Sequence, residues 1–568
     1  MIGIDLGTTN SAIAVWHDGR PRLIPNSLGQ VLTPSAVSID DDGQLLVGMA
    51  ARERQVTHPR MTATAFKRYM GTNRVTRLGD REFLPEELSA LVLRSLKSDA
   101  ERDLGVPVTS AIITVPAYFN DKQRKATRRA GELAGLGVDR LINEPTAAAL
   151  AYGIDRRQDE TRYLVFDLGG GTFDVSILEI FEGVIEVRAS TGDSYLGGED
   201  FNEVLIQDML RQYGAPWGFA SREQDPLLYE LLRDQAERAR RQLTIQPVAS
   251  MVITWKGQQF EHSVTSESFE NKCQGLLSRL RDPVMRALRD SSIDLDELKE
   301  IVLVGGATRM PVVRRTVTRM FGRFPASELN PDEAVAMGAA IQAGLKARDA
   351  ALKEVVLTDV CPYTLGVDTA ERRPDGTFRA DVFAPIIERN TVIPASREKR
   401  FATIQDGQEK IVFTVFQGES RIASENIRLG TIELPVPPRR RGEVSVTCRF
   451  SYDVNGLLEV DVQESAKGER RQLVVFDRDQ SAPDTDVEER RKKLADLKVH
   501  PRETAANRAA LARAARCYEH FLAEKRQEVQ RLTSTFEAAL DRQDPVAADH
   551  ARAQFLAALD RLEGQSFL

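Results

Sequence analysis

Two aspartates flank a run of three glycines near residue 170, and these residue types suit phosphate and magnesium chemistry. An apolar run over 163–166 is followed by Asp167, Leu168 and glycines at 169–171; Thr172 then adds a hydroxyl group, and a second strand-like run follows. The pattern predicts a buried strand, a glycine turn and a return strand. Amide N–H groups in such a turn can surround phosphate oxygens, and Asp167 and Asp174 could hold a hydrated Mg²⁺. Taken alone, the pattern is more often an ordinary hairpin turn.

The beginning of the chain repeats this arrangement. An apolar run ends in Asp5, Gly7 follows, Thr8 and Thr9 supply hydroxyl groups, and a second strand-like run begins. Such internal similarity indicates two related halves that face each other. A nucleotide between them would meet one hairpin from each side. The sequence contains no Walker-type G-x-x-x-x-G-K-[ST] loop, so this clamp is a different solution to phosphate binding.

A third glycine turn follows the predicted strand 300–304. Gly305 and Gly306 precede Ala307 and Arg309, and Pro311 stands where a first helical residue is expected. A helix N-terminus beside a glycine turn suits an anion or a ribose, although an ordinary strand–helix connection has the same pattern. Three such turns in one chain, two of them with an aspartate, favour a nucleotide site.

These motifs are similar to the phosphate and adenosine motifs of the actin, sugar kinase and DnaK superfamily. Residues 4–11, 115–121, 142–149 and 166–174 resemble specifically the DnaK (heat-shock-seventy) chaperones. The resemblance covers most of the chain and fades after about residue 480. It is strongest toward the shorter bacterial paralogues of the HscC kind.

The resemblance implies a role for many individual residues. The implied catalytic set is Asp5, Lys67, Glu144, Asp167, Thr172 and Asp174. In it the three aspartates would organise Mg²⁺ through water molecules, and Lys67 would stabilise charge at the γ-phosphate. The implied nucleotide contacts are Gly7, Thr8, Thr9, Asn10, Gly169, Gly170, Gly171, Thr172, Gly198, Glu237, Arg240, Arg241, Thr244, Gly305, Gly306, Ala307, Arg309 and Asp332. ATP or ADP and Mg²⁺ are the expected cofactors, with K⁺ as a further candidate.

The predicted adenine-binding residues share one helix. Glu237, Arg241 and Thr244 follow the i, i+4, i+7 spacing of one helix face. Arg240 stands where the family usually has lysine, and Thr244 where it often has serine. Arginine and lysine differ in geometry, so the affinity of the site for adenine is the property that these differences would change.

Residues 1–352 alternate strand-like and amphipathic helical runs and predict an actin-like, two-lobed α/β ATPase domain. One predicted helix runs from Asp121 to Leu136 with an aspartate cap. Residues 353–359 are a short apolar segment, either an edge strand or, by resemblance, the interdomain linker. The implied coupling residues are Pro116, Arg124, Val355, Val356, Leu357 and Asp359. Thr358 departs from the family's usual leucine.

Residues 360–480 change to short alternating runs separated by turns, which predicts a β-sandwich. By resemblance this is a peptide-binding domain that grips an extended segment. The implied groove residues are Val367, Thr369, Phe401, Ile404, Ile411, Phe413 and Val446. Arg439–Arg441 form a short basic run that we interpret as a solvated loop. Residues 481–568 predict a short helical lid, in which a helix restarts at Asp544-Pro545.

Length, charge and cysteine content limit the classes of protein to which this chain can belong. A chain of 568 residues requires several domains. A net charge of −7 favours neither a nucleic-acid partner nor an acidic tail. Four scattered cysteines argue against zinc and disulfides and fit a cytoplasmic protein. No apolar run approaches the ~20 residues that span a membrane, and no signal peptide is expected.

We therefore expect an ATP-dependent chaperone that binds extended apolar segments of unfolded or client proteins. The resemblance implies a J-domain co-chaperone and a nucleotide exchange factor as partners. Two alternatives stay open. A sugar kinase on the same fold would leave residues 360–480 without a role, and a non-hydrolysing relative, such as an exchange factor, would bind ATP without turnover.

Overall fold

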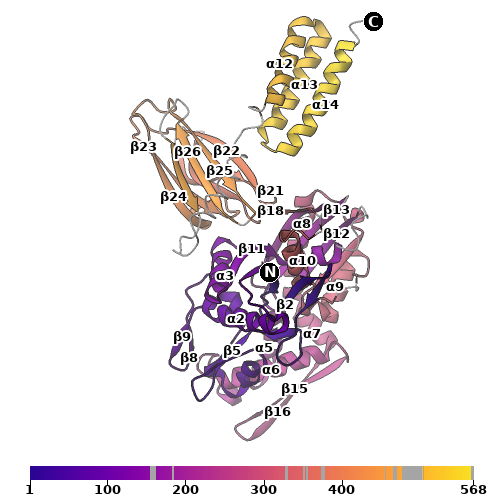
Figure 1. Cartoon of the computed structure of the whole chain (residues 1–568). Helices are drawn as coiled ribbons and strands as arrows, with labels where there is room; N and C mark the ends of the chain where they lie inside the picture. Colours follow the sequence, from indigo (N-terminus) through magenta and orange to yellow (C-terminus); the bar gives the residue numbers. More distant parts are fainter. Residues whose placement is uncertain are drawn as a thin grey trace. The chain divides into compact units, whose positions relative to one another are not determined.

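The computed structural model describes residues 1–153, 161–181, 184–326, 330–349, 352, 356–372, 378–454, 456–464, 470–475, 502 and 505–564. The chain divides into two compact units, Met1–Tyr363 and Thr364–Leu568, whose elements Figure 1 labels. The finer division predicted at residues 352, 359 and 480 stays a prediction. Val355 of the predicted linker lies outside the described residues.

The first sheet of the first unit begins with the N-terminal hairpin. Its strand order is β11-β10-β1-β2-β3, with β4 paired to β2. The strands are β1 (Ile2–Asp5), β2 (Asn10–His17), β3 (Arg20–Leu23), β4 (Leu32–Pro34), β10 (Ser110–Val115) and β11 (Gly137–Asn143). β1 pairs in parallel with β10 and antiparallel with β2. The predicted hairpin is therefore confirmed, and β1 lies inside the sheet, as its apolar sequence requires.

A second sheet repeats the arrangement around the glycine hairpin. In the first unit its order is β17-β12-β13-β14-β18. The strands are β12 (Thr161–Leu168), β13 (Phe173–Phe181), β14 (Val184–Asp193), β17 (Glu300–Val304) and β18 (Val356–Val360). β12 and β13 pair antiparallel, with Asp167 opposite Asp174. β17 joins β12 in parallel, so the glycine turn after β17 ends beside the hairpin turn.

Two alanine-rich helices, α4 (Glu144–Gly153) and α10 (Ala334–Lys346), pack closely against each other and against the first sheet. A Cβ on Gly338 would lie 1.7 Å from the carbonyl oxygen of Ala147, and one on Gly3 would lie 2.2 Å from the backbone nitrogen of Ala340. Only small residues permit this approach, so the spacing depends on glycine and alanine at these positions.

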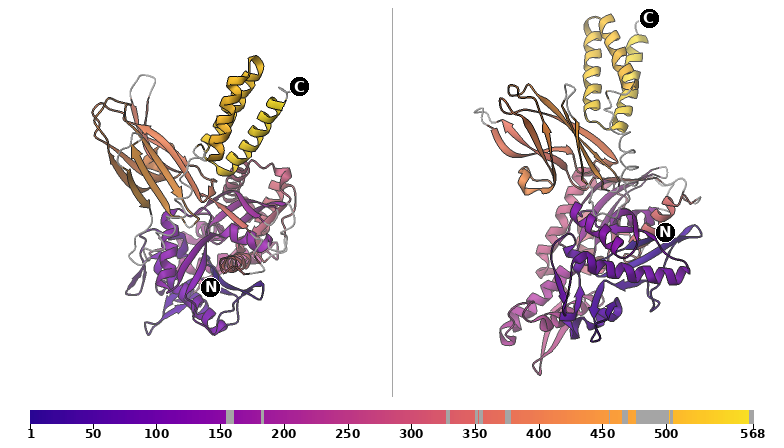
Figure 2. Two further views of the ribbon diagram at one scale, coloured as in Figure 1. Left: turned by 45° about the horizontal axis from the view of Figure 1, so that its top comes forward. Right: turned by 60° about the vertical axis from the view of Figure 1, so that its left-hand side comes forward.

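Further helices and small sheets complete the first unit. Figure 2 shows two more views of the chain. The helices are α1 (Met49–Thr57), α2 (Pro85–Leu104), α3 (Asp121–Leu133), α5 (Gly198–Trp217), α6 (Pro226–Gln242), α7 (Ser266–Lys272), α8 (Gln274–Ser291) and α9 (Pro311–Phe321). The small strands are β5 (Ala36–Ile39), β6 (Leu45–Val47), β7 (Thr62–Thr64), β8 (Thr76–Leu78), β9 (Arg81–Phe83), β15 (Val248–Trp255) and β16 (Gln258–Thr265).

Two helix boundaries differ from the prediction. α3 takes Asn120, not Asp121, as its N-cap, because Asn120 and Gln123 bond reciprocally to each other's backbone N–H groups. α3 ends at Leu133, and Gly135 follows with a φ of 74°. α6 ends at Gln242, so Thr244 lies in the turn after the helix, where its N–H bonds to the Arg241 carbonyl three residues back. The helix therefore ends before Thr244, which the sequence pattern placed within it.

The second unit contains two four-stranded sheets, ordered β20-β19-β23-β24 and β22-β25-β26-β27. Their strands are β19 (Leu365–Arg372), β20 (Phe378–Ile387), β22 (Ala395–Ala402), β23 (Lys410–Gln417), β24 (Ile427–Pro435), β25 (Ser445–Tyr452), β26 (Leu458–Glu464) and β27 (Arg470–Val475). Neighbours within each sheet are antiparallel. The short alternating runs of residues 360–480, separated by turns, predict this all-β pattern.

In the described residues after the sheets there are three helices: α12 (Ala505–His520), α13 (Ala523–Asp541) and α14 (Pro545–Gly564). Phe536 and Phe555 stack in their shared core with ring centroids 4.6 Å apart. The predicted restart at Asp544 is confirmed, since its carboxylate accepts the N–H groups of Val546 and Ala547. Among the described residues, no helix is both long and apolar enough to cross a membrane.

Candidate functional site: a cavity between two hairpins

A cavity of about 440 Å³ opens in the first unit where the turns of the two hairpins face each other. The turns nearly touch, because a Cβ on Gly170 would lie 2.1 Å from the hydroxyl oxygen of Thr9. The third turn closes beside them, and Gly305 there has a φ of 81°, which favours glycine. Three turns that are far apart in the sequence therefore line one cavity.

Most of the predicted site residues line this cavity. They are Asp5, Gly7, Thr8, Thr9, Asn10, Lys67, Glu144, Asp167, Gly169, Gly170, Thr172, Gly198, Glu237, Arg240, Arg241, Thr244, Gly305, Gly306, Ala307, Arg309 and Asp332. Gly171 and Asp174 are not part of its lining; the Asp174 carboxylate instead accepts the N–H of Tyr118 at 3.0 Å. The sequence reasoning missed Glu199, which follows Gly198 in the first turn of α5. Its acidic side chain directly after two glycines was the available signal.

Three aspartates gather near the phosphate-suited turns. Asp167 and Asp174 are buried, and Asp5 accepts a hydrogen bond from the Thr114 hydroxyl at 2.9 Å. One carboxylate oxygen of Asp167 is buried without a hydrogen-bond partner among the described residues. Such an oxygen is costly to bury unless a cation or a donor satisfies it.

The electrostatics of these aspartates follow from burial. Burial, followed by the charge of Glu144, raises the pKa of Asp5 to about 7 and that of Asp174 to about 8. The pKa of Asp167 lies well above its usual value for the same reasons. Carboxylates held this way release their protons readily only when a cation compensates them. Hard oxygen ligands of this kind fit Mg²⁺.

A metal ion at this place would need water among its ligands. Among the residues that the structure describes, no three His, Cys, Asp or Glu side chains are arranged to hold a metal ion directly. Mg²⁺ typically keeps several of its waters, so the donor set fits a hydrated ion.

A buried ion pair lies beside the aspartates. Lys67 donates to Glu144 at 2.6 Å, and the Lys67 side chain is 2% exposed. Lys67 comes from the segment 66–69 and Glu144 from the start of α4, so the pair joins two distant parts of the unit. A lysine fixed at the cavity wall can stabilise negative charge on a bound phosphate.

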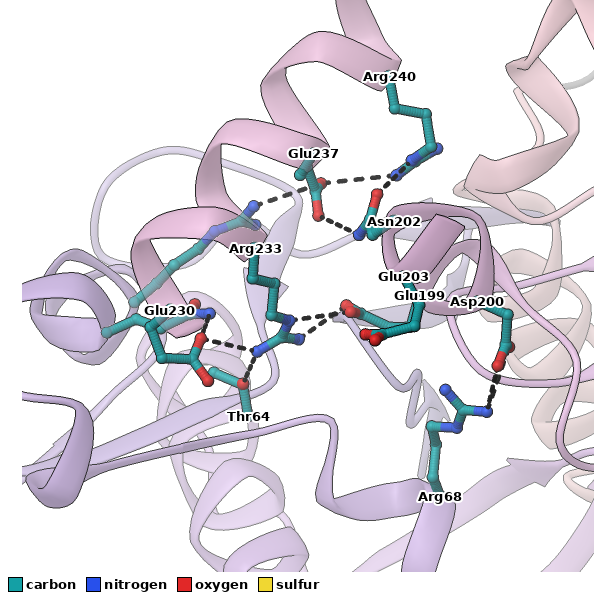
Figure 3. A network of polar contacts seen from close by, with 12 residues as sticks. Thr64, Arg68, Glu199, Asp200, Asn202, Glu203, Glu230, Arg233, Glu237 and Arg240 are labelled. Carbon is teal, nitrogen blue, oxygen red and sulfur yellow. Dashed lines mark hydrogen bonds and ion pairs between the residues drawn. The ribbon is translucent and has the colours of Figure 1, made fainter. Parts of the chain in front are cut away.

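A second polar network borders the cavity on the side of α5 and α6 (Figure 3). At its centre Arg233 donates to both oxygens of Glu199 at 2.8 and 2.9 Å, to the Thr64 hydroxyl at 2.6 Å and to Glu230 at 3.3 Å. Thr64 comes from β7, so the guanidinium bridges elements 169 residues apart. Burial alone would raise the pKa of Glu199, but the charge and hydrogen bonds of Arg233 lower that pKa to about 2.

The residues predicted to contact adenine and ribose form hydrogen bonds with one another and with Asn202. Arg241 donates to Glu237 at 2.6 Å. Arg240 donates to Asn202 at 2.8 Å (Figure 3). Arg309 donates to Asp332 at 2.7 Å. Burial lowers the pKa of Arg240, although the nearby Glu237 opposes this. These contacts preorganise the cavity wall.

The predicted coupling residues form a chain of hydrogen bonds within the first unit. Arg124 donates to the side-chain oxygen of Asn143 at 2.6 Å, and the Asn143 amide donates to both oxygens of Asp359 at 3.0 Å. β18, which contains Val356, Leu357 and Asp359, pairs in parallel with β14. Pro116 follows β10 directly and accepts the N–H of Phe119 at 3.1 Å.

Some predicted groove residues of the second unit lie together. Phe401 and Phe413 make an edge-to-face contact with centroids 5.1 Å apart, and Phe401 pairs with Val446 across β22 and β25. Val367, Ile411, Phe413 and Val446 are buried, whereas Thr369, Phe401 and Ile404 are partly exposed. Phe401 and Ile404 are thus the partly exposed apolar members of this set, and the groove itself stays a prediction.

Comparison with known proteins agrees with this geometry. The family model described as "Hsp70 protein" matches residues 1–77 and 72–566. The chain is 43% identical over 496 residues to the chaperone protein DnaK of Thermotoga petrophila, a match that covers 85% of this chain and 81% of the relative. It is 44% identical over 490 residues to DnaK of Thermotoga neapolitana, covering 84% and 80%. The chaperone protein dnaK3 of Thermosynechococcus vestitus is 44% identical over 506 residues, covering 84% and 72%.

The chain belongs to the Hsp70 family. The predicted resemblance to the DnaK chaperones is thereby confirmed.

Proposed function

We infer that this chain is an ATP-dependent molecular chaperone and an ATPase, and that the cavity between the two hairpins is its ATP site. Family membership supports the activity. One observation carries the site: turns from the two sheets face each other across a cavity lined by Asp5 and Asp167, and one buried oxygen of Asp167 has no hydrogen-bond partner among the described residues.

We propose that hydrolysis relies on positioning and charge rather than on a covalent intermediate. Mg²⁺, when bound, neutralises phosphate charge. Asp5, Asp167 and Asp174 orient its water ligands and the attacking water. Thr8, Thr9 and Thr172 and the amides of the glycine turns hold phosphate oxygens, and Lys67 stabilises charge at the γ-phosphate. The buried Lys67–Glu144 pair supports this role, because it fixes the ammonium group at the cavity wall.

The finer architecture belongs to the same proposal. Residues 1–352 act as a two-lobed, actin-like ATPase domain, residues 353–359 as the linker, residues 360–480 as the peptide-binding sandwich and residues 481–568 as the lid. The antiparallel sheets of the second unit and the three helices that follow them support this division.

Coupling between ATP and peptide runs through the linker in this proposal. The chain of contacts from Arg124 through Asn143 to Asp359 supports it. So does Tyr118, whose N–H donates to Asp174, because it lies in the segment that follows Pro116. ATP binding and peptide binding then change each other's affinity reciprocally. Client segments, a J-domain co-chaperone and an exchange factor are the proposed partners, and the cytoplasm is the proposed location.

The rate of peptide release tests this function. A fluorescent, extended apolar peptide is bound to the full chain, and its dissociation is followed with and without ATP. We expect ATP to accelerate release in the wild type and to have a much smaller effect in Thr172→Ala, because that variant loses a phosphate-binding hydroxyl. Peptide binding that ATP does not alter would argue against coupling, and absent peptide binding would argue against the groove.

A further inference from the structure

Three consecutive arginines, Arg439, Arg440 and Arg441, occupy the loop between β24 and β25. All three are exposed. The neighbouring Lys410 pairs with Glu433, whereas no ion pair joins Arg439 or Arg440 to any residue in the described part of the chain. Two guanidinium groups are therefore available to a ligand.

Backbone hydrogen bonds hold this loop against the segment that carries the predicted groove. The N–H of Gly407 donates to the Arg439 carbonyl at 2.8 Å, and the N–H of Gly442 donates to the Thr403 carbonyl at 2.9 Å. Thr403 precedes Ile404, a partly exposed groove residue. The loop accordingly lies beside the segment that carries Ile404, at one edge of the predicted groove, although the sequence alone suggested only a solvated loop.

The edge is locally positive. Segments 399–410 and 439–443 together contain six basic and three acidic residues, and Glu433 offsets Lys410, which leaves a net charge of +2 in a chain whose net charge is −7. Two of the acidic side chains serve the loop itself. Asp406 accepts the backbone N–H of Arg441 at 2.7 Å, and Glu443 accepts that of Arg440 at 3.3 Å. Their hydrogen bonds are thus made to the backbone of the loop.

We propose that the groove prefers extended client segments whose apolar core is followed or preceded by acidic residues, and that Arg439 and Arg440 recognise this flank. The proposal rests on the proposed function, because it needs a peptide in the groove. An extended peptide advances about 3.3 Å per residue, so a carboxylate two to four residues beyond the core lies about 7 to 13 Å from it. Exposed charges act over about 8 Å at physiological ionic strength, which makes the effect modest and sensitive to salt.

The experiment measures binding of three labelled peptides to the full chain in ADP by fluorescence anisotropy. The peptides share one apolar core and carry neutral, acidic or basic flanks. At low ionic strength we expect the acidic peptide to bind about 3- to 10-fold more tightly than the basic one, with most of the difference in the association rate. At about 0.5 M salt the difference disappears.

Two double variants assign the preference. Arg439→Ser with Arg440→Ser should remove the flank preference while the neutral peptide keeps its affinity, which also shows that the groove remains folded. Arg20→Ser with Arg60→Ser removes the same charge from exposed positions of the first unit and should leave the preference unchanged.

The outcomes separate this proposal from the proposed function. If the neutral peptide binds but the three flanks are equivalent, the groove stands and the flank proposal is overturned. A preference for the acidic flank that persists in the loop variant also overturns the flank proposal, because residues other than Arg439 and Arg440 then recognise the flank. If the loop arginines instead govern binding to phosphatidylserine vesicles without affecting peptides, the loop serves a membrane surface and the proposal fails. If no peptide binds, the groove and the flank proposal both fail.

Discussion

Two groups of buried charge lie near the turns of the first unit, and they are compensated differently. Around Arg233 each charge has a partner: the guanidinium bonds Glu199, Glu230 and Thr64. Around the hairpin turns, Asp5, Asp167 and Asp174 share the nearby Lys67, which itself bonds Glu144. Burial accordingly raises the pKa of Asp5 and Asp174, whereas Arg233 lowers the pKa of Glu199 against the effect of burial.

The difference separates a structural role from a binding role. A buried pair that is fully bonded holds two elements in register without a ligand. A buried acidic cluster with an unbonded oxygen is complete only when a cation and its nucleotide arrive. In this ATP-dependent chaperone of the Hsp70 family, we therefore assign a structural role to the paired group and Mg²⁺ binding to the acidic group.

Removing the Arg233 guanidinium should have the largest effect on the stability of the first unit. Arg233→Met leaves Glu199 buried without the guanidinium that bonds both of its oxygens, so we expect the free energy of unfolding to fall by about 3–5 kcal/mol. The chain's three tryptophans, Trp16, Trp217 and Trp255, all lie in the first unit, so their fluorescence during urea unfolding reports on that unit.

The matched control is Arg233→Met combined with Glu199→Gln. Neutralising the orphaned carboxylate should restore part of the lost stability. An unchanged urea midpoint in Arg233→Met would show that the paired network does not stabilise the unit.

Neutralising the acidic cluster should affect function and stability in opposite directions. In Asp174→Asn we expect single-turnover ATP hydrolysis to slow by about 100-fold, because a charge that organises Mg²⁺ is lost. Without nucleotide and magnesium, the same variant should unfold at higher urea than the wild type, since one uncompensated carboxylate is gone. Lower stability in the magnesium-free state would contradict the distinction drawn between the two groups.

The pH dependence of stability should also have opposite signs. Glu199, with its pKa lowered from 4.5 to about 2, contributes stability above pH 4.5 that is lost as the pH falls toward 2. Asp5 and Asp174, with pKa values raised from 3.8 to about 7 and 8, carry no penalty below pH 3.8 and their full penalty above pH 8. In EDTA, stability of the first unit should therefore fall between pH 5 and 8.

Mg²⁺ with ADP provides the control for this experiment. The complex compensates the acidic cluster, so the decline between pH 5 and 8 should flatten. In Asp174→Asn the decline should be shallower even in EDTA. Urea midpoints that do not change over this range would remove the electrostatic basis of the comparison.

The smallest effect is expected at the adenine side. Arg240→Lys keeps the charge but loses the planar donor that bonds Asn202. We expect ADP to bind about 2- to 5-fold more weakly by isothermal titration, an effect on the scale of a single hydrogen bond. Asn202→Ala should weaken ADP binding by a similar factor, and the double variant should add little beyond either change. Independent, additive effects would show that the two side chains act separately.

Local sequence predicted the hairpins well, because each is defined by neighbouring residues. The apolar runs around Asp5 and Asp167 and the glycines between them specify strand, turn and strand, and the registers of β1 with β2 and of β12 with β13 agree. The end of α6 was predicted less well. Its helical spacing continues through Thr244, but the last turn tightens to an i−3 hydrogen bond, which periodicity does not reveal.

The sequence by itself determined which chemistry this protein carries: aspartates and hydroxyl residues beside glycine turns, repeated in two halves, and alternating strands in the second unit. Only the tertiary structure decided which charges are compensated. Arg233 meets Thr64 across 169 residues, and Asn143 meets Asp359 across 216. Burial and long-range contacts set the pKa values and the unbonded oxygen of Asp167, and neither property is encoded in any single stretch of sequence.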